Sequence, residues 1–205
     1  KLAKSAGLNL TPILRTTKNS SYQKEGVVSN AQSLEALERF IREMVGTYKD
    51  SIRQWEMTNE PELEVDPYIP QELVQVQKAT YFAMKEKDLD TLLLAGAHTS
   101  GVAEILPGEL MCGSYDYTDA YSYHRYIYNN KPEGGIESLA NNVRKLINDL
   151  GGWKELYVTE GGWPTSIDPE TGKPKSPSVT EEWQRNYVVR AFLTEMTIDP
   201  HRVYE

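Results

Sequence analysis

The chain has 205 residues, of which 39% are hydrophobic and 25% charged, a composition typical of one folded globular domain. Thirty acidic and 22 basic side chains give a net charge of −8, which argues against a nucleic-acid partner, because phosphates require clustered basic residues. No apolar run is long enough to cross a bilayer, so no membrane partner is expected. Cys112 is the only cysteine, which excludes an internal disulfide.

Segments with strand and helix patterns alternate along the chain. Short apolar runs predict strands, apolar residues at helical spacing predict helices, and Ser33, Pro70 and Thr180 are suited to helix starts. In chain order we expect a helix end at 1–6, a strand at 10–17, a helix at 33–48, a strand at 52–58, a helix at 70–87, strands at 91–97 and 120–126, a helix at 136–150, a strand at 155–160, an exposed loop at 166–178, a helix at 180–198, a turn at 199–202 and the start of a strand at Val203-Tyr204.

This alternation predicts an α/β fold with a parallel sheet. The strand at 91–97 is almost continuously apolar, as expected of a strand covered on both faces. The chain has neither a Gly-x-Gly-x-x-Gly motif nor a phosphate-binding loop, so a (β/α)8 TIM barrel fits better than a nucleotide-binding fold. A full barrel has about 250 residues or more. We therefore expect residues 1–205 to form one incomplete barrel that lacks its first strands and the end of its last strand.

Two glutamates lie where predicted strands end and turn residues begin. Glu60 lies in the segment WEMTNEP (55–61) and Glu160 in YVTEGGWPT (157–165). The chemistry of barrel enzymes lies at the carboxyl ends of the strands. Cleavage of a glycosidic bond needs one protonated carboxyl for the leaving oxygen and one ionised carboxyl for the positive charge that develops on the sugar carbon. Either glutamate alone indicates only a turn, but the pair predicts a glycosidase.

Histidines and further acidic residues also fall near these strand ends. His98 lies at the end of the strand predicted at 91–97, directly after Ala97. It could contact a substrate hydroxyl, although packing at the rim is the commoner role for such a residue. Glu56 shares a strand face with Glu60 and is expected to form a buried pair with Arg or Lys, whereas Glu62 is expected to be a loop charge. The three histidines are scattered without metal-ligand spacing, so neither a metal nor another cofactor is predicted.

The motifs resemble those of the retaining glycoside hydrolases of clan A. The resemblance rests on Asn59-Glu60-Pro61, His124-Arg125-Tyr126 and TEGGWP (159–164), and it covers essentially the whole chain. It implies a (β/α)8 barrel that runs from about strand three to the start of strand eight, with Glu60 ending strand four and Glu160 ending strand seven. Within the clan, WExxNEPxL is similar to family 39, which includes β-xylosidases and α-iduronidases, and to family 5. The ExGWPT segment is also similar to family 17 β-1,3-glucanases.

The resemblance implies a role for each catalytic residue. Glu60 is expected to be the general acid/base and Glu160 the nucleophile that forms a glycosyl-enzyme intermediate, which requires carboxyls roughly 5–5.5 Å apart. Asn59 is expected to hydrogen-bond the sugar 2-hydroxyl. Tyr126 is expected to donate a hydrogen bond to the nucleophile, and Tyr123 replaces it if the strand register is off by one or the strand carries a bulge.

Two further residues are expected to bind substrate on the same grounds. His124 is expected to line the pocket beside the two glutamates. Trp163, three residues after Glu160, either stacks on a sugar face or packs against its own loop.

These motifs together predict a retaining glycoside hydrolase that cleaves β-glycosidic bonds of a poly- or oligosaccharide by double displacement. The alternative is a carbohydrate-binding barrel without catalysis. A third reading, a barrel enzyme that holds a metal with paired carboxylates, is separated from the first by chelation. The substrate class favours an extracellular or periplasmic location. The sugar, the linkage and the oligomeric state are left open.

Overall fold

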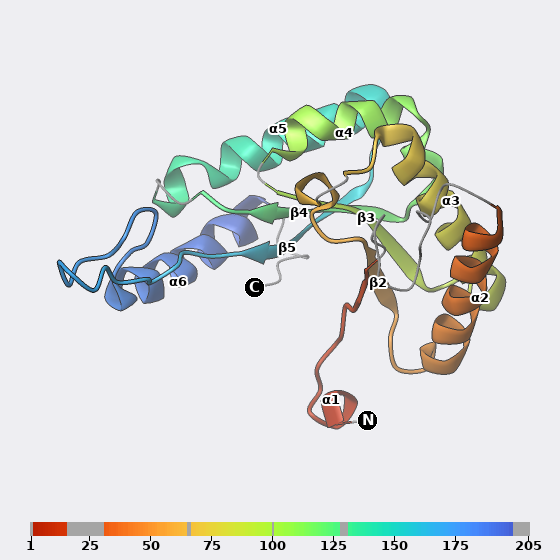
Figure 1. Ribbon diagram of the computed structural model, residues 1–205, viewed down its shortest axis with the longest axis horizontal. Coiled ribbons are helices and arrows are strands. Elements are labelled where there is room, and N and C mark those ends of the chain that lie inside the picture. The colour runs from red at the N-terminus through yellow and green to blue at the C-terminus, as the bar shows by residue number, and fades with distance from the viewer. Residues whose placement is uncertain (1, 16–30, 65–66, 100, 128–130, 199–205) are drawn as a thin grey trace.

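The structure, a computed structural model, describes residues 2–15, 31–64, 67–99, 101–127 and 131–198 (Figure 1). Within these residues, five parallel strands form one sheet in chain order: β1 (Ile13–Leu14), β2 (Gln54–Met57), β3 (Leu92–His98), β4 (Ala120–Arg125) and β5 (Glu155–Gly161). The helices are α1 (Leu2–Ser5), α2 (Ala31–Tyr48), α3 (Pro70–Lys87), α4 (Val102–Met111), α5 (Ile136–Leu150) and α6 (Glu181–Ile198), with short 3-10 helices η1 (Pro61–Leu63), η2 (Ser114–Tyr117) and η3 (Pro132–Gly134). The predicted α/β fold with a parallel sheet is confirmed, but the sheet is open, so a closed barrel is not seen.

Helices α2 to α5 cover the outer face of the sheet, with α2 beside α3 and α4 beside α5 (Figure 1). The apolar side chains of α2 and α3 pack on β1 to β3, in a core that includes Leu14, Ile41, Val45, Trp55, Met57, Val76 and Leu93. Those of α4 and α5 pack on β3 to β5, in a core that includes Ala95, Leu106, Tyr121, Tyr123, Val143, Ile147 and Val158. The α6 helix packs on α5 and on Trp163, which follows β5.

The predicted boundaries of α3, α5 and α6 are confirmed to within one residue, because local capping determines them, whereas Ser33, predicted at a helix start, lies inside α2. The Glu72 carboxylate accepts a hydrogen bond from the Ile69 N–H at 3.2 Å, just before α3. The Thr180 hydroxyl likewise accepts one from the Trp183 N–H at 3.2 Å, at the start of α6. Gly151 follows α5, and its N–H donates to the carbonyl of Ile147 at 2.9 Å.

The α4 helix was not expected from the sequence. Pro107 lies inside it, and a proline there lacks the N–H that would bond one turn back, so the local pattern indicates a break. Packing of Val102, Leu106 and Leu110 in the outer core stabilises the helix in spite of this. With α4, strands and helices alternate from β1 to α6.

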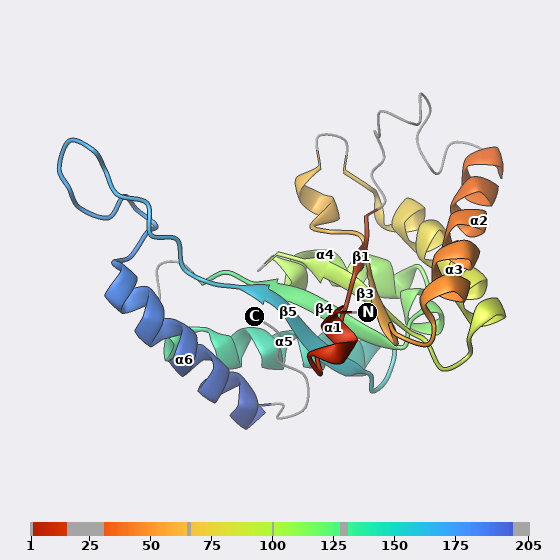
Figure 2. The ribbon, with the colours of Figure 1, turned by 90° about the horizontal axis from the view of Figure 1, so that it is seen from below.

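The remaining expectations concern the first strand, the end of the chain and the long loop. The strand expected at 10–17 is reduced to β1 in the part described, and the turn at 199–202 and the strand at Val203-Tyr204 lie outside it. The exposed loop expected at 166–178 is confirmed, and it extends away from the sheet as a long loop between β5 and α6 (Figure 2). No helix among the described residues has the length and apolar character needed to cross a membrane.

The sheet is strongly curved, as a contact between its second and fifth strands shows. The Thr159 hydroxyl on β5 donates to the Glu56 carboxylate on β2 at 2.6 Å, although β3 and β4 lie between them. In a flat sheet three strand spacings amount to roughly 14 Å, farther than these two side chains reach. Both therefore lie on a concave inner face. Glu56 is buried, as predicted, but among the described residues its contact is the Thr159 hydroxyl and not an Arg or Lys.

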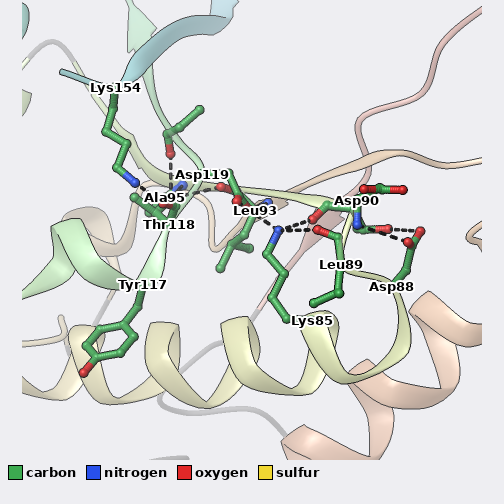
Figure 3. A network of polar contacts seen from close by, with 12 residues as sticks. Lys85, Asp88, Leu89, Asp90, Leu93, Ala95, Tyr117, Thr118, Asp119 and Lys154 are labelled. Atoms are coloured by element: carbon green, nitrogen blue, oxygen red, sulfur yellow. Dashed lines mark hydrogen bonds and ion pairs between the residues drawn. The ribbon is translucent and has the colours of Figure 1, made fainter.

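A network of polar contacts holds the amino edge of the sheet together (Figure 3). Lys85 on α3 pairs with Asp119 at 2.9 Å, and the other oxygen of this carboxylate accepts the N–H of Leu93 at 2.7 Å. Lys154, just before β5, donates to the carbonyl of Thr118 at 2.8 Å. In barrels this edge serves stability and the opposite edge serves chemistry.

Gly161, the last residue of β5, provides a test of the close approach between β4 and β5. A Cβ on Gly161 would lie 2.8 Å from the carbonyl oxygen of Arg125 and 3.0 Å from its guanidinium. We expect Gly161→Ala to lower the free energy of unfolding by about 1–3 kcal/mol, because overpacking forces the backbone to shift. Chemical denaturation measures the change. Gly162→Ala is the control, because nothing lies within 4 Å of its Cβ position. Equal effects of the two substitutions would contradict the expectation.

Arg125 and Glu195 form a buried ion pair that joins β4 to α6, with 2.5 Å between Nε and Oε1. Burial raises the pKa of Glu195, and the Arg125 charge opposes this only in part. We expect Glu195→Ala to destabilise the protein by about 3–5 kcal/mol, because it removes the carboxylate from a buried guanidinium. Thermal and chemical unfolding measure the loss. Glu133→Ala, which breaks the exposed pair with Arg190, should have little effect.

Candidate active site

Glu60, His124 and Glu160 meet at the carboxyl edge of the sheet. The Nδ1 atom of His124 lies 2.9 Å from Oε1 of Glu60 and 2.7 Å from Oε2 of Glu160. The His124 side chain is 1% exposed, whereas those of Glu60 and Glu160 are 20% and 46% exposed. One donor atom from each residue lies within 4.8 Å of the other two. A buried imidazole thus joins two carboxylates that solvent can reach, and three of the predicted site residues are brought together.

An irregularity between β4 and β5 directs Glu160 toward the other two residues. Tyr123 pairs with Val158, but the next residue, His124, pairs with Glu160, so β5 has one extra residue, Thr159. Strand residues alternate between faces, and such a bulge changes the direction of the residues that follow it. Thr159 reaches Glu56 on the inner face, and Glu160 then reaches His124 on the same face.

The turn after β2 places Glu60 by an unusual backbone conformation. Glu60 has φ 45° and ψ 55°, and Thr58 and Ala97 also have positive φ, at 65° and 51°. The N–H of Glu60 donates to the carbonyl of Ala97 on β3 at 2.8 Å, which fixes the turn to the neighbouring strand. Left-handed residues other than glycine each store roughly 1–3 kcal/mol of strain and cluster at functional sites.

The same three side chains offer the donor atoms of a possible metal site. One imidazole nitrogen and two carboxylate oxygens are a ligand set of the type that zinc accepts. Sequence spacing predicted no metal, because 64 residues separate His124 from Glu60 and only the fold joins them. In the structure the two Nδ1 to oxygen distances are those of hydrogen bonds.

Asn59 and Tyr126 lie close in sequence to the cluster. Asn59 immediately precedes Glu60 and is half-buried, and Tyr126 directly follows β4 and is also half-buried. Their expected contacts with the sugar and with the nucleophile stay predictions. Tyr123 does not take the place of Tyr126, because its side chain is buried in the outer core with those of α4 and α5.

Trp163 is packed inside the protein, 2% exposed. Its ring meets the ring of Tyr187 on α6 edge to face at 5.2 Å, and the Arg125 guanidinium lies over it at 5.2 Å. Of the two roles expected for Trp163, the structure shows packing against its surroundings, and no face is left open for a sugar.

His98 lies away from the cluster, because a second irregularity turns it outward. Gly96 pairs with Ser122, but His98 pairs with Tyr123, so Ala97 is an extra residue in β3. His98 is therefore fully buried on the outer side of the sheet, with Nδ1 2.9 Å from Glu62 and Nε2 2.7 Å from Glu109 on α4. Sequence periodicity could not reveal this, since an uninterrupted strand would place His98 on the inner face.

The two carboxylates determine the charge of His98. Burial alone lowers the pKa of His98, but Glu109 and Glu62 outweigh it and raise the pKa to about 10. Burial also opposes ionisation of Glu62, but hydrogen bonding and attraction to His98 lower its pKa to about 2. Glu62 was expected to be a simple loop charge, and it instead belongs to a buried ion network.

No protein-family model matches the chain, and no curated protein matches it. Its fold is similar to those of solved glycoside hydrolases. One is a family 39 glycoside hydrolase from the gut symbiont Bacteroides cellulosilyticus WH2, with a TM-score of 0.71 and 18% identity over 99% of this chain and 44% of that chain. A glucosidase from Croceicoccus marinus has a TM-score of 0.72 and 15% identity, over 98% of this chain and 43% of that chain. A β-D-glucuronidase from Dictyoglomus thermophilum has a TM-score of 0.67 and 16% identity, over 100% of this chain and 34% of that chain.

The fold of this chain is therefore similar to part of the fold of these glycoside hydrolases. The chain spans less than half the length of each of these three proteins. At such low identity the similarity concerns the fold alone, and the chemistry has to be argued from the side chains at the carboxyl edge of the sheet.

His98 gives a prediction about stability and pH. An unfolded histidine has a pKa of about 6.5, whereas the pKa of folded His98 is about 10. The folded state holds the proton more tightly between these values, so its stability falls as the pH rises through this window. We expect the free energy of unfolding to fall more steeply from pH 6.5 to 10 in the wild type than in His98→Asn. Urea denaturation at several pH values measures both slopes, and parallel slopes would contradict the assignment.

Proposed function

We propose that the chain is the catalytic region of a retaining glycoside hydrolase of clan A, similar to family 39, that cleaves β-glycosidic bonds of an oligo- or polysaccharide. The supporting observation is the pair of carboxylates, Glu60 after β2 and Glu160 on β5, whose oxygens approach within 4.8 Å beside His124. Retaining enzymes hold their carboxyls roughly 5–5.5 Å apart, whereas inverting enzymes leave roughly 6.5–9.5 Å for a water. The short separation favours the retaining mechanism.

In the proposed reaction the two glutamates act in sequence. The Glu160 carboxylate attacks the anomeric carbon while Glu60 donates its proton to the leaving oxygen, and a glycosyl ester forms on Glu160. The Glu60 carboxylate then removes a proton from a water, which attacks the same carbon and releases the sugar with its original configuration. Glu160 is the more exposed of the two glutamates, which suits a nucleophile because that group must reach the sugar ring.

The other proposed roles follow from position. His124 contacts both carboxylates and would hold their oxygens in place, because its own ring is buried and cannot turn freely. Asn59 would bind the sugar 2-hydroxyl and Tyr126 would donate to the nucleophile. His98 and Trp163 are omitted from the proposed substrate site, because both are buried against other protein groups.

A panel of aryl β-glycosides tests the proposal. The panel holds the xyloside, glucoside, galactoside, mannoside, glucuronide and cellobioside, and hydrolysis is followed by release of the chromophore. We expect the protein to hydrolyse at least one member and Glu160→Ala to be inactive, because it lacks the nucleophile. Glu60→Ala should lose about 10²–10⁴-fold in rate on substrates with poor leaving groups, the contribution of general acid catalysis.

Azide distinguishes the roles of the two glutamates. In Glu160→Ala, azide fills the vacated space and attacks the anomeric carbon once, so a glycosyl azide of inverted configuration should form. In Glu60→Ala, azide attacks the glycosyl-enzyme in the second displacement, so the azide product should keep the original configuration. NMR of the products reads the configuration. Glu64→Ala removes a nearby carboxylate that pairs with Arg15 at 3.4 Å and serves as the control with unchanged rate.

Other outcomes would contradict the proposal in distinct ways. Loss of hydrolysis on chelation with EDTA would indicate that Glu60, His124 and Glu160 hold a catalytic metal. Sugar binding without hydrolysis of any panel member would favour a carbohydrate-binding barrel.

A further inference from the structure

A second histidine between two carboxylates lies behind the turn that carries Glu60. His98, at the end of β3, has Glu62 of η1 at 2.9 Å from Nδ1 and Glu109 of α4 at 2.7 Å from Nε2. The imidazole and Glu109 are buried, and the Glu62 side chain is 17% exposed. The proposed reaction uses none of these groups.

These groups connect to Glu60 through a very short stretch of backbone. Glu62 is two residues after Glu60, and Pro61 between them restricts the chain. The Glu62 carboxylate accepts the N–H of Thr99 at 2.6 Å in addition to the His98 ring. The N–H of Glu60 donates to Ala97 at 2.8 Å. Ala97 and His98 at the end of β3, together with Thr99 directly after it, thus hold both sides of the turn.

Glu60 needs such support because its own backbone is unfavourable. A non-glycine residue with φ 45° persists only where the surroundings determine it more strongly than its local preference. His98 supplies a rigid anchor, since a carboxylate faces each of its ring nitrogens. Glu109 in turn fixes the ring to α4, which is packed in the outer core.

We infer that His98 and Glu62 are positioning residues for Glu60, with Glu109 holding His98 in place. The inference rests on the proposed function, in which Glu60 donates the proton to the leaving oxygen. A loss of the Glu62 to His98 contact would let the turn relax and move the Glu60 carboxyl away from that oxygen. Misplacement of a catalytic group by about 1 Å costs about 10²-fold in rate.

The test compares leaving groups in Glu62→Gln and His98→Gln. A 2,4-dinitrophenyl glycoside needs little acid assistance, whereas a phenyl glycoside of the same sugar depends on it. We expect kcat/KM to fall at least tenfold for the phenyl glycoside and less than threefold for the dinitrophenyl glycoside. Glu64→Gln, in the same loop, is the control and should leave both rates unchanged. Equal losses on both substrates would show a merely structural role and overturn the inference.

Hydrogen exchange tests the same inference without any substrate. The amide of Glu60 bonds to Ala97, and the amide of Leu92, at the opposite end of β3, bonds to Arg53 at 2.8 Å. In Glu62→Gln we expect exchange at Glu60 to accelerate at least tenfold while Leu92 is unchanged. Unchanged exchange at Glu60, or equal acceleration at both amides, would overturn the inference. If the wild type hydrolyses no glycoside, the proposed function fails but this exchange result still decides whether the contact holds the turn.

Replacement of His98 is expected to cost stability, because it leaves the buried Glu109 carboxylate and the largely buried Glu62 carboxylate without the charge between them. Glu62→Gln avoids this, since the partly exposed carboxylate becomes an amide of similar shape that can still accept the Thr99 N–H. If His98→Gln does not fold, Glu62→Gln alone serves for both the leaving-group comparison and the hydrogen-exchange measurement.

Discussion

The two extra residues in the sheet, Ala97 in β3 and Thr159 in β5, are the constraint on which the candidate active site depends. In a regular strand, successive side chains alternate between faces, and a single insertion reverses every side chain after it. The insertion in β5 directs Glu160 toward His124, and the insertion in β3 removes His98 from the same face. Both lie at the carboxyl edge, where the strong curvature of the sheet brings distant strands together.

The two histidines of the described structure show how burial divides similar groups into different roles. Each lies between two carboxylates, but His124 faces carboxylates that solvent reaches, whereas His98 is enclosed with Glu109. An enclosed imidazolium between carboxylates is suited to holding backbone segments, and an accessible pair of carboxylates is suited to reacting with a substrate. The buried Arg125–Glu195 pair and the polar network at the amino edge hold the scaffold beneath both groups.

Similarity of fold and chemistry of the site are separate grounds for the proposed function. Solved glycoside hydrolases match 86–100% of this chain at 13–18% identity, which shows similarity of fold alone. The same arrangement of strands and helices serves many reactions. What favours glycoside cleavage is that this arrangement joins Glu60 and Glu160 at a separation suited to double displacement.

The sequence alone determined the α/β class and most helix boundaries, and it singled out Glu60 and Glu160 as candidate catalytic residues, because apolar periodicity, capping residues and strand-end motifs are local signals. It failed at α4, where Pro107 obscures the helical pattern and only packing on the outer core restores it. Tertiary structure alone decided that His124 joins Glu60 to Glu160, that His98 and Trp163 are buried, and that Glu62 contacts His98. These contacts depend on register and curvature, which arise from pairing between strands far apart in the chain and leave no periodic trace in any one of them.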